Sequence, residues 1–391
     1  MPKANRRNFL KLSGLSALPA MIPAAGLFAA EKKHTPEPAD ELPIKFFGDG
    51  EMFEPAAYID LLKQANSTTA IERDRYGDGG SIAALEKKFT EITGKEKAIF
   101  MPTGTMANQL AIAVLSGENT KVFVQDTSHV YRDEADAAQS VFQKRLMPLA
   151  KGETYFTAAA LKQAVDALAE QEVFKSGVGA VSIENPVRRS EGRMVPLDEI
   201  KKISAYCKAN DIKLHLDGAR IFLAAAWSGV SVKEYASYFD TVYISLYKYM
   251  GAAGGAVLCG DKKVIEKMPH LIKIHGGSMY GNWANAAMAL NRLEGLELRM
   301  LQTRMRSTDL FTELNKLPGI KITALDGGTN LYKLELAKEV DGKKLQASLK
   351  NNFNIRMPIP DNNNSGLIAV NETLLYRDLA YVVDAFTKSL A

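Results

Sequence analysis

Two apolar segments of this chain each end in one ionisable side chain, and these two side chains could together bind and activate a cofactor. The segments are Lys213–Asp217 and Thr241–Lys248. Apolar runs rich in β-branched residues are typical of buried strands in parallel sheets, and such sheets bind ligands at the carboxyl ends of their strands. We therefore expect the carboxylate of Asp217 to lie beside the amine of Lys248.

A carboxylate next to an amine meets the needs of pyridoxal phosphate (PLP). The lysine can form a Schiff base with the aldehyde of PLP, and the aspartate can keep its pyridine nitrogen protonated so that the ring withdraws electrons. A lone lysine after a strand is usually a solvated strand end. The pairing of Lys248 with Asp217 is therefore what favours a cofactor site.

Two further segments could complete such a site. At Gly104-Thr105 a short apolar strand turns into a helix, and a helix N-terminus offers free amides and the positive end of its dipole to a phosphate. His129 follows another apolar strand, where an imidazole can lie over an aromatic cofactor or act as a base. Taken singly, the first feature is an ordinary capped helix and the second an ordinary loop residue.

In their order and spacing these segments resemble the low-specificity L-threonine aldolases, which belong to the β-eliminating lyases among the fold-type I PLP enzymes. The resemblance implies an α/β fold, with a mostly parallel sheet in a large domain at residues 45–300 and a smaller C-terminal α+β domain at residues 301–391. Agreement in several separate segments is more specific than any single motif. The matching segments are Tyr76–Asp78, Pro102–Asn108, Ser128-His129, Ile183–Asn185, Val195–Leu197, His215–Arg220, Lys248 and Gly276–Met279.

The resemblance implies a role for each matched residue. Lys248 would hold PLP, Asp217 would pair with the pyridine nitrogen, and His129 would stack on the ring and serve as a base. Lys248 and His129 would thus be the catalytic residues. The full set of cofactor contacts, including phosphate contacts and an arginine near the phenolic oxygen of PLP or the substrate carboxylate, is Gly104, Thr105, His129, Asp217, Arg220, Ser245 and Lys248.

The substrate side of the pattern departs from the family. Gly48 stands where the family has a serine and Leu367 where it has an arginine, and both of those residues bind the substrate carboxylate. The family's second active-site histidine is also missing. Arg356 could compensate from a neighbouring strand, although an exposed arginine is the simpler interpretation. Three tyrosines could contact a bulkier substrate: Tyr247, Tyr249 and Tyr280.

These observations favour a PLP-dependent carbon–carbon lyase that cleaves the Cα–Cβ bond of a β-hydroxy-α-amino acid to glycine and an aldehyde. The alternatives are β-elimination, transamination or racemisation of another amino compound, and a PLP-binding protein without turnover. We expect a small amino substrate as the ligand and a homodimer or homotetramer as the assembly, with Gly276–Met279 near the subunit interface. The altered substrate side predicts weak cleavage of L-threonine itself.

Composition excludes several other classes of protein. The formal charge of +4 includes a basic N-terminus, and the remaining lysines are scattered among acidic residues, so nothing favours a nucleic-acid partner. The two cysteines and five histidines form no disulfide framework or metal-binding spacing, so no metal site is expected.

Hydrophobic periodicity predicts strands that alternate with helices, which is typical of a parallel sheet covered on both faces. The predicted helices cover residues 82–93, 158–170, 197–209, 285–300, 343–350 and 374–389. The predicted strands cover residues 98–101, 121–124, 180–184, 213–216, 241–245, 255–258, 320–324, 330–335 and 367–370.

The N-terminus carries a separate signal. Arg6-Arg7 precede a weakly hydrophobic run over residues 12–30 that two prolines interrupt. Twin arginines before such a run are typical of a Tat export signal, and the prolines disfavour a transmembrane anchor. We expect residues 1–30 to be a signal peptide, residues 31–44 to be a linker, and the mature protein to be periplasmic without a membrane span.

This interpretation predicts how the twin arginines act in cells. Replacing Arg6→Lys together with Arg7→Lys should leave the protein in the cytoplasm with its N-terminus uncleaved, because Tat recognition depends on the arginine pair. Cell fractionation and N-terminal sequencing measure both effects, with Lys32→Arg as the control. Normal periplasmic accumulation of the double variant would show that the segment is not a Tat signal.

Overall fold

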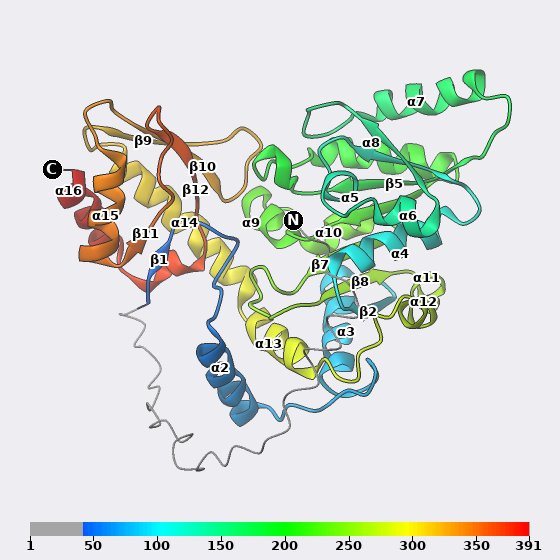
Figure 1. Ribbon diagram of the computed structural model, residues 1–391, viewed down its shortest axis with the longest axis horizontal. Coiled ribbons are helices and arrows are strands. Elements are labelled where there is room, and N and C mark those ends of the chain that lie inside the picture. The colour runs from blue at the N-terminus through cyan, green and yellow to red at the C-terminus, as the bar shows by residue number, and fades with distance from the viewer. Residues whose placement is uncertain (1–41, 391) are drawn as a thin grey trace, which may run out of the picture. The chain divides into compact units, whose positions relative to one another are not determined.

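A seven-stranded sheet forms the centre of the structure, a computed structural model that describes residues 42–390 (Figure 1). Its strand order is β2-β8-β7-β6-β5-β3-β4. The strands from β7 to β4 are parallel, whereas β8 is antiparallel to both of its neighbours. The strand bounds are Lys97–Met101 (β2), Lys121–Gln125 (β3), Arg145–Leu149 (β4), Val178–Glu184 (β5), Lys213–Asp217 (β6), Thr241–Ser245 (β7) and Ala256–Gly260 (β8).

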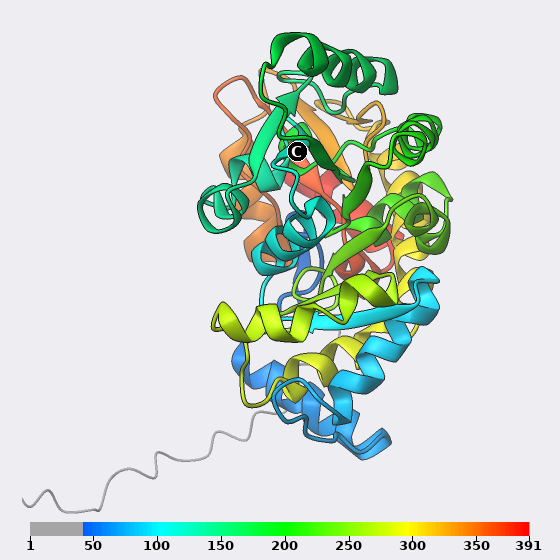
Figure 2. The same cartoon turned by 90° about the vertical axis from the view of Figure 1, so that its right-hand side faces the viewer.

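Alternate side chains of the central strands enter two different hydrophobic cores. On β7, Val242 and Ile244 pack into one core and Tyr243 into another on the opposite face. This period of two follows from the pleat, and burial on both faces explains why the strand is apolar throughout. Figure 2 shows helices on both sides of the strands, as the alternating pattern of the sequence predicts.

Helices connect the strands and cover the sheet. Among them α4 packs across β5 to β8, and α3 packs on β2 and β8. The helix bounds are Pro55–Thr68 (α2), Gly80–Thr93 (α3), Gly104–Ser116 (α4), His129–Arg132 (α5), Ala137–Phe142 (α6), Ala158–Gln171 (α7), Leu197–Ala209 (α8), Ile221–Ser228 (α9), Val232–Ser237 (α10), Lys262–Ile265 (α11), Met268–Ile274 (α12), Trp283–Leu293 (α13), Leu296–Leu314 (α14), Gly342–Phe353 (α15) and Leu379–Leu390 (α16).

The C-terminal part of the chain builds a separate antiparallel sheet, drawn in orange and red in Figure 1. It has the order β12-β10-β9, and α14, α15 and α16 share one hydrophobic core with it. A short parallel pair, β1 with β11, adds Ile44 and Ile355 to that core. The bounds are Ile44–Lys45 (β1), Ile320–Ala324 (β9), Leu331–Leu336 (β10), Ile355–Arg356 (β11) and Ser365–Ala369 (β12).

Two predicted helices are interrupted in the structure. The helix predicted over residues 285–300 is divided into α13 and α14, because Gly295 adopts the left-handed conformation with φ of 65° between them. The helix predicted over residues 374–389 begins as a 3₁₀ turn, Glu372–Tyr376, and continues as α16. The division into domains at residue 300 stays a prediction, and this position lies inside α14.

Between residues 42 and 390, no helix is both long and apolar enough to cross a bilayer. The predicted signal peptide lies outside these residues.

Candidate active site

A cavity opens at the carboxyl ends of β6 and β7, where the sequence predicts a ligand site. It encloses about 780 Å³ of empty space, part of which is open to solvent. Six of the seven predicted cofactor contacts line it, whereas Ser245 is fully buried in β7 and does not. The lining residues are Pro102, Thr103, Gly104, Thr105, His129, Glu184, Asp217, Ala219, Arg220, Tyr243, Tyr247, Lys248, Ala253, Gly254 and Gly255.

Lys248 and Asp217 reach this cavity from neighbouring strands. β6 and β7 pair in parallel with Asp217 opposite Tyr243, and Lys248 follows the end of β7 by three residues. Burial lowers the pKa of the Lys248 amine to about 8, and the nearby Arg220 cation contributes in the same direction. An amine with this pKa is partly uncharged near neutral pH and can attack a carbonyl carbon.

Asp217 is held as a hydrogen-bond acceptor in the interior. Its side chain is only 2% exposed. One carboxylate oxygen accepts from Asn108 Nδ2 at 2.9 Å, and the other accepts from the backbone amide of Ala219 at 3.2 Å. A carboxylate fixed in this way can accept a hydrogen bond from a protonated pyridine nitrogen.

Glu134 holds His129 in place. His129 Nδ1 donates to Glu134 Oε1 at 2.9 Å, and the same oxygen accepts from Asn108 Nδ2 at 2.7 Å. The hydrogen bond to Glu134 raises the pKa of His129, while burial raises the pKa of Glu134 itself. Because Nδ1 is occupied by this bond, Nε2 is the imidazole nitrogen left to exchange a proton with a ligand.

Asn108 is oriented by a third buried group. Its Oδ1 lies 2.9 Å from Nε2 of His215, and Nδ1 of His215 lies 2.8 Å from the Thr241 hydroxyl. Burial lowers the pKa of His215 to about 4, so this imidazole is neutral. Its Nε2–H donates to Asn108 Oδ1, which directs Nδ2 of Asn108 toward the two carboxylates.

The start of α4 forms the anion-binding end of the cavity. Thr103 caps the helix by accepting from the amide of Met106 at 3.1 Å. The amides of Gly104 and Thr105 belong to the first turn, where no acceptor within the helix exists. A Cβ at position 104 would lie 2.0 Å from the Tyr243 hydroxyl, so only glycine fits at this turn. Together, the amine, the buried carboxylate and this turn fit the aldehyde, ring nitrogen and phosphate of PLP.

The Arg220 guanidinium group forms an ion pair with Asp49 within the protein. Its Nε and Nη2 donate to the two carboxylate oxygens of Asp49, at 2.7 and 3.0 Å. This bidentate pair neutralises the arginine and leaves Nη1 for a ligand. Arg220 therefore offers a substrate carboxylate less charge than the sequence suggests.

The other predicted substrate contacts lie away from the cavity. Arg356 is exposed on β11 and does not line the cavity, so it does not replace the missing carboxylate contact. Leu367, which stands in place of the family's arginine, lies opposite Lys333 in the C-terminal sheet. Tyr249 is buried and Tyr280 is exposed, and of the three tyrosines only Tyr247 lines the cavity. Gly48 has a φ of 82°, a conformation in which the family's serine would be strained.

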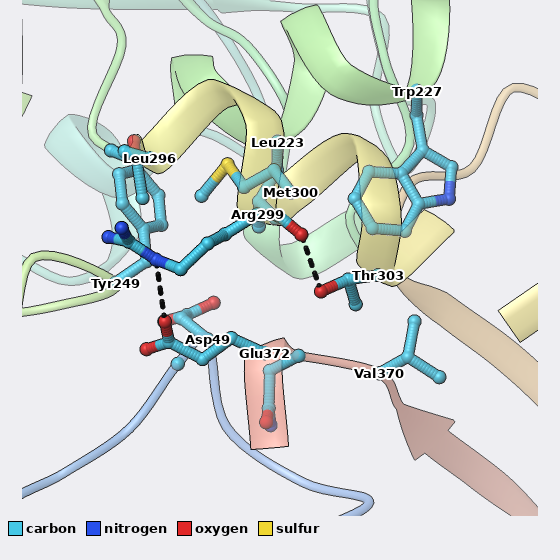
Figure 3. Close-up of a pocket in the computed structure, with 12 residues that line it drawn as sticks. Asp49, Leu223, Trp227, Tyr249, Leu296, Arg299, Met300, Thr303, Val370 and Glu372 are labelled. Atoms are coloured by element: carbon cyan, nitrogen blue, oxygen red, sulfur yellow. Dashed lines mark hydrogen bonds and ion pairs between the residues drawn. The ribbon is translucent and has the colours of Figure 1, made fainter. Parts of the chain in front are cut away.

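A smaller hollow behind Asp49 and Tyr249 has a different character (Figure 3). It encloses about 300 Å³, and its charged residues are bonded to each other: Arg299 Nε donates to Glu372 Oε2 at 3.2 Å. The Thr303 hydroxyl donates to the backbone carbonyl of Arg299 at 2.8 Å. The ion pair joins α14 to the 3₁₀ turn Glu372–Tyr376, and the hydroxyl bond lies within α14. These polar groups are therefore already paired with each other.

Comparison with known proteins identifies the family. The sequence profile of the β-eliminating lyases matches residues 60–337. The chain belongs to this family. It is 32% identical to a low-specificity L-threonine aldolase from Candida albicans over 285 residues, which are 72% of this chain and 75% of that protein. It is also 33% identical to the alanine racemase TOXG from Cochliobolus carbonum over 54% of each chain.

Solved structures confirm the fold class. The structure of a putative L-allo-threonine aldolase from Listeria monocytogenes has a TM-score of 0.73 and 24% identity, and the match covers 89% of this chain and 97% of that one. These structures confirm the predicted fold-type I architecture. The family match confirms the prediction of a PLP-dependent lyase of this family.

Several residues that build the site were not assigned a role from the sequence. Asn108 and Glu184 lie within matched segments, but neither type nor spacing shows that they hold other side chains. Glu134 follows His129 by five residues, and this short spacing is the one local signal of the pair. Asp49 is distant from Arg220 in sequence, so only the fold shows their contact.

The Glu134 contact predicts a change in the pKa of His129. Glu134→Gln keeps a hydrogen-bond acceptor but removes the negative charge, so the pKa of His129 should fall, and turnover of an amino-acid substrate should fall about tenfold or more. Because the neutral imidazole is the base, the acid limb of the kcat/KM profile should move to lower pH. NMR titration of His129 and the pH profile measure these effects.

Two variants serve as controls for this prediction. Glu134→Asp retains the charge and should keep the pKa of His129 above that in Glu134→Gln. Glu118→Gln, at an exposed position, should change neither quantity. An unchanged pKa and pH profile in Glu134→Gln would show that Glu134 does not tune His129.

Proposed function

We propose that this protein cleaves the Cα–Cβ bond of a β-hydroxy-α-amino acid to glycine and an aldehyde, using PLP held at Lys248. The observation that carries the proposal is the arrangement of three groups around one cavity: the Lys248 amine, the buried Asp217 carboxylate and the His129–Glu134 pair. The names of its relatives, which include a threonine aldolase, support the same reaction.

The residues of the chain have distinct tasks in this reaction. Lys248 would hold the aldehyde carbon of PLP, Asp217 the ring nitrogen, and the Gly104-Thr105 turn the phosphate. When bound, the cofactor supplies the electron sink for the electron pair that is released as the Cα–Cβ bond breaks. Arg220, through its Nη1 edge, is the charged contact for the substrate carboxylate.

Proton transfer is the task of the imidazole and its neighbours. His129 Nε2 accepts the proton of the β-hydroxyl group, and the Glu134 carboxylate stabilises the resulting imidazolium. Glu184 is only 4% exposed, and its carboxylate accepts a hydrogen bond from the backbone amide of His129 at 2.7 Å. Burial raises the pKa of Glu184 to about 7. Glu184 is therefore a second group in the cavity wall that can hold a proton near neutral pH.

The proposal predicts turnover that depends on Lys248. The purified chain with PLP should release glycine and an aldehyde from β-hydroxy-α-amino acids, and Lys248→Ala should lower turnover by at least about a thousandfold, because the amine that anchors the cofactor is lost. Borohydride reduction followed by peptide mapping should label the peptide that contains Lys248. Lys262→Ala, at an exposed position, is the control. Labelling elsewhere, or full turnover in Lys248→Ala, would contradict the proposal.

Racemisation is a second candidate, because the chain is similar to an alanine racemase over half its length. The same lysine and aspartate serve both reactions. Chiral chromatography after incubation with L-alanine separates them: formation of D-alanine without aldehyde from β-hydroxy amino acids favours racemisation. The altered substrate side of the cavity predicts that L-threonine is a weak substrate in either case.

We also propose that the protein assembles as a homodimer or homotetramer. Exposed apolar side chains gather around the predicted interface segment: Ile274 is 61% exposed, Tyr280 66% and Tyr76 54%. The rings of Tyr76 and Tyr280 lie edge to face with centroids 5.4 Å apart. Apolar surface of this kind is stabilised by contact with another subunit.

Light scattering tests this assembly. The protein should have at least twice the mass of one chain, and Tyr280→Asp should increase the monomer fraction by placing a charge in the contact. Phe174→Asp, at a residue 91% exposed on the loop after α7, should leave the mass unchanged. A wild-type monomer with full turnover would refute the proposal.

Export through the Tat pathway remains a further proposal. It depends on the twin arginines and the weakly hydrophobic run, which lie outside residues 42–390. Tat carries folded proteins, which suits an enzyme that acquires its cofactor before export.

A further inference from the structure

A second hollow shares a wall with the cofactor cavity. It encloses about 700 Å³, and two residues, Tyr247 and Ala253, line both spaces. The opposite wall is formed by the segment before α2 and the start of that helix, including Met52, Phe53, Pro55, Tyr58 and Ile59. The two spaces therefore lie next to each other, with Tyr247 and Ala253 between them.

The walls of the hollow are mainly apolar and partly open to water. Met52 is 70% exposed, Ile59 53% and Tyr247 46%, which are high values for large apolar side chains. Large apolar groups that gather around a hollow next to a reactive group are typical of a ligand pocket. A ligand with an apolar group of matching size would cover these side chains.

Several contacts hold this wall in a fixed arrangement. A Cβ at Gly251 would lie 2.6 Å from Cε2 of Phe53, so the Phe53 ring lies directly against the backbone of the segment that follows Lys248. The Arg292 guanidinium carbon is 5.4 Å from the centre of the same ring. The Tyr58 hydroxyl donates to the carbonyl of Ala284 at 3.2 Å. A wall anchored in this way presents a preformed surface, which lowers the entropic cost of binding.

The weak contacts available to the substrate carboxylate also favour a role for the apolar hollow in substrate binding. Arg220 is neutralised by Asp49, and neither Arg356 nor Leu367 lies at the cavity, so the substrate carboxylate gains little binding free energy. A substrate that is held weakly at its carboxylate must be stabilised through another part of its structure. The apolar hollow is the part of the site that can provide this.

We propose that this hollow binds the β-substituent of the amino acid, and that the chain prefers amino acids with an aromatic or similarly large apolar group at Cβ. The proposal rests on the proposed function in one respect, the attachment of the amino group at Lys248. It does not depend on whether the Cα–Cβ bond is then cleaved.

Binding of two amino acids without a β-hydroxyl group tests this preference in the PLP-loaded protein. L-Phenylalanine and L-alanine differ by one phenyl ring, and neither can undergo the proposed cleavage. Titration by calorimetry and visible absorbance should give a Kd for L-phenylalanine at least about tenfold lower than that for L-alanine, because the ring is removed from water.

Variants of the wall locate the preference. Ile59→Asp should weaken L-phenylalanine binding about tenfold or more and leave L-alanine binding within about twofold, because a charge then faces the apolar group. Met52→Asp, outside the helix, should act in the same way and serves if the first variant folds poorly. Ile359→Asp is the matched control, since Ile359 is 54% exposed and lies outside the hollow.

Each outcome is decisive. Equal affinities for the two amino acids, or equal effects of Ile59→Asp and Ile359→Asp, would overturn the inference. A retained preference in Ile59→Asp with a smaller mass in light scattering would overturn it too, because the hollow would then be a subunit contact. Preference for L-phenylalanine without aldehyde release from β-phenylserine would support the inference and contradict the proposed function alone.

Discussion

The buried amide of Asn108 connects most of the groups on which the site depends. Its Nδ2 donates to both Asp217 and Glu134, and its Oδ1 accepts from His215. Asn108 lies on α4 one turn after Gly104, so the same helix carries the phosphate turn and the amide that orders the carboxylates. Loss of this amide would remove one donor from each of two buried carboxylates, and buried carboxylates are costly when their hydrogen bonds are not made. The position of α4 against the sheet thus determines the geometry of the whole cofactor side.

The second constraint is electrostatic. Three carboxylates, Glu134, Glu184 and Asp217, are each at most 6% exposed near the same cavity. Burial raises the pKa of Glu134 and of Glu184, and the negative charge of nearby Asp217 adds to this effect. The hydrogen bond to Glu134 and the charges of the other two carboxylates raise the pKa of the His129 imidazole, which favours its positive form beside them. The cavity therefore holds several exchangeable protons in a small volume, which suits a reaction in which protons move at the β-hydroxyl and at Cα.

The two sides of the site are built on different kinds of structure. The cofactor side is formed by strand ends and by the first turn of a helix, whose positions are set by the sheet. The substrate side is formed by the segments around residues 48–59 and 247–255, which are largely loops. Loops tolerate substitution without loss of the fold, so a chain of this family can retain the cofactor contacts while its substrate contacts change.

The amino-acid sequence by itself determined the local structure and the chemistry of the cofactor. The apolar runs ending at Asp217 and near Lys248, and the Gly104-Thr105 turn, are short-range patterns whose strands and helix form as expected. The parallel sheet follows because buried strands alternate with amphipathic helices. Only the tertiary structure decided that Glu134 and Asn108 orient His129, that Asp49 neutralises Arg220, and that Ser245, Arg356 and Leu367 lie away from the cavity. These contacts join residues through the packing of α4, β5 and β6, and no local pattern in the chain specifies which distant side chains will meet.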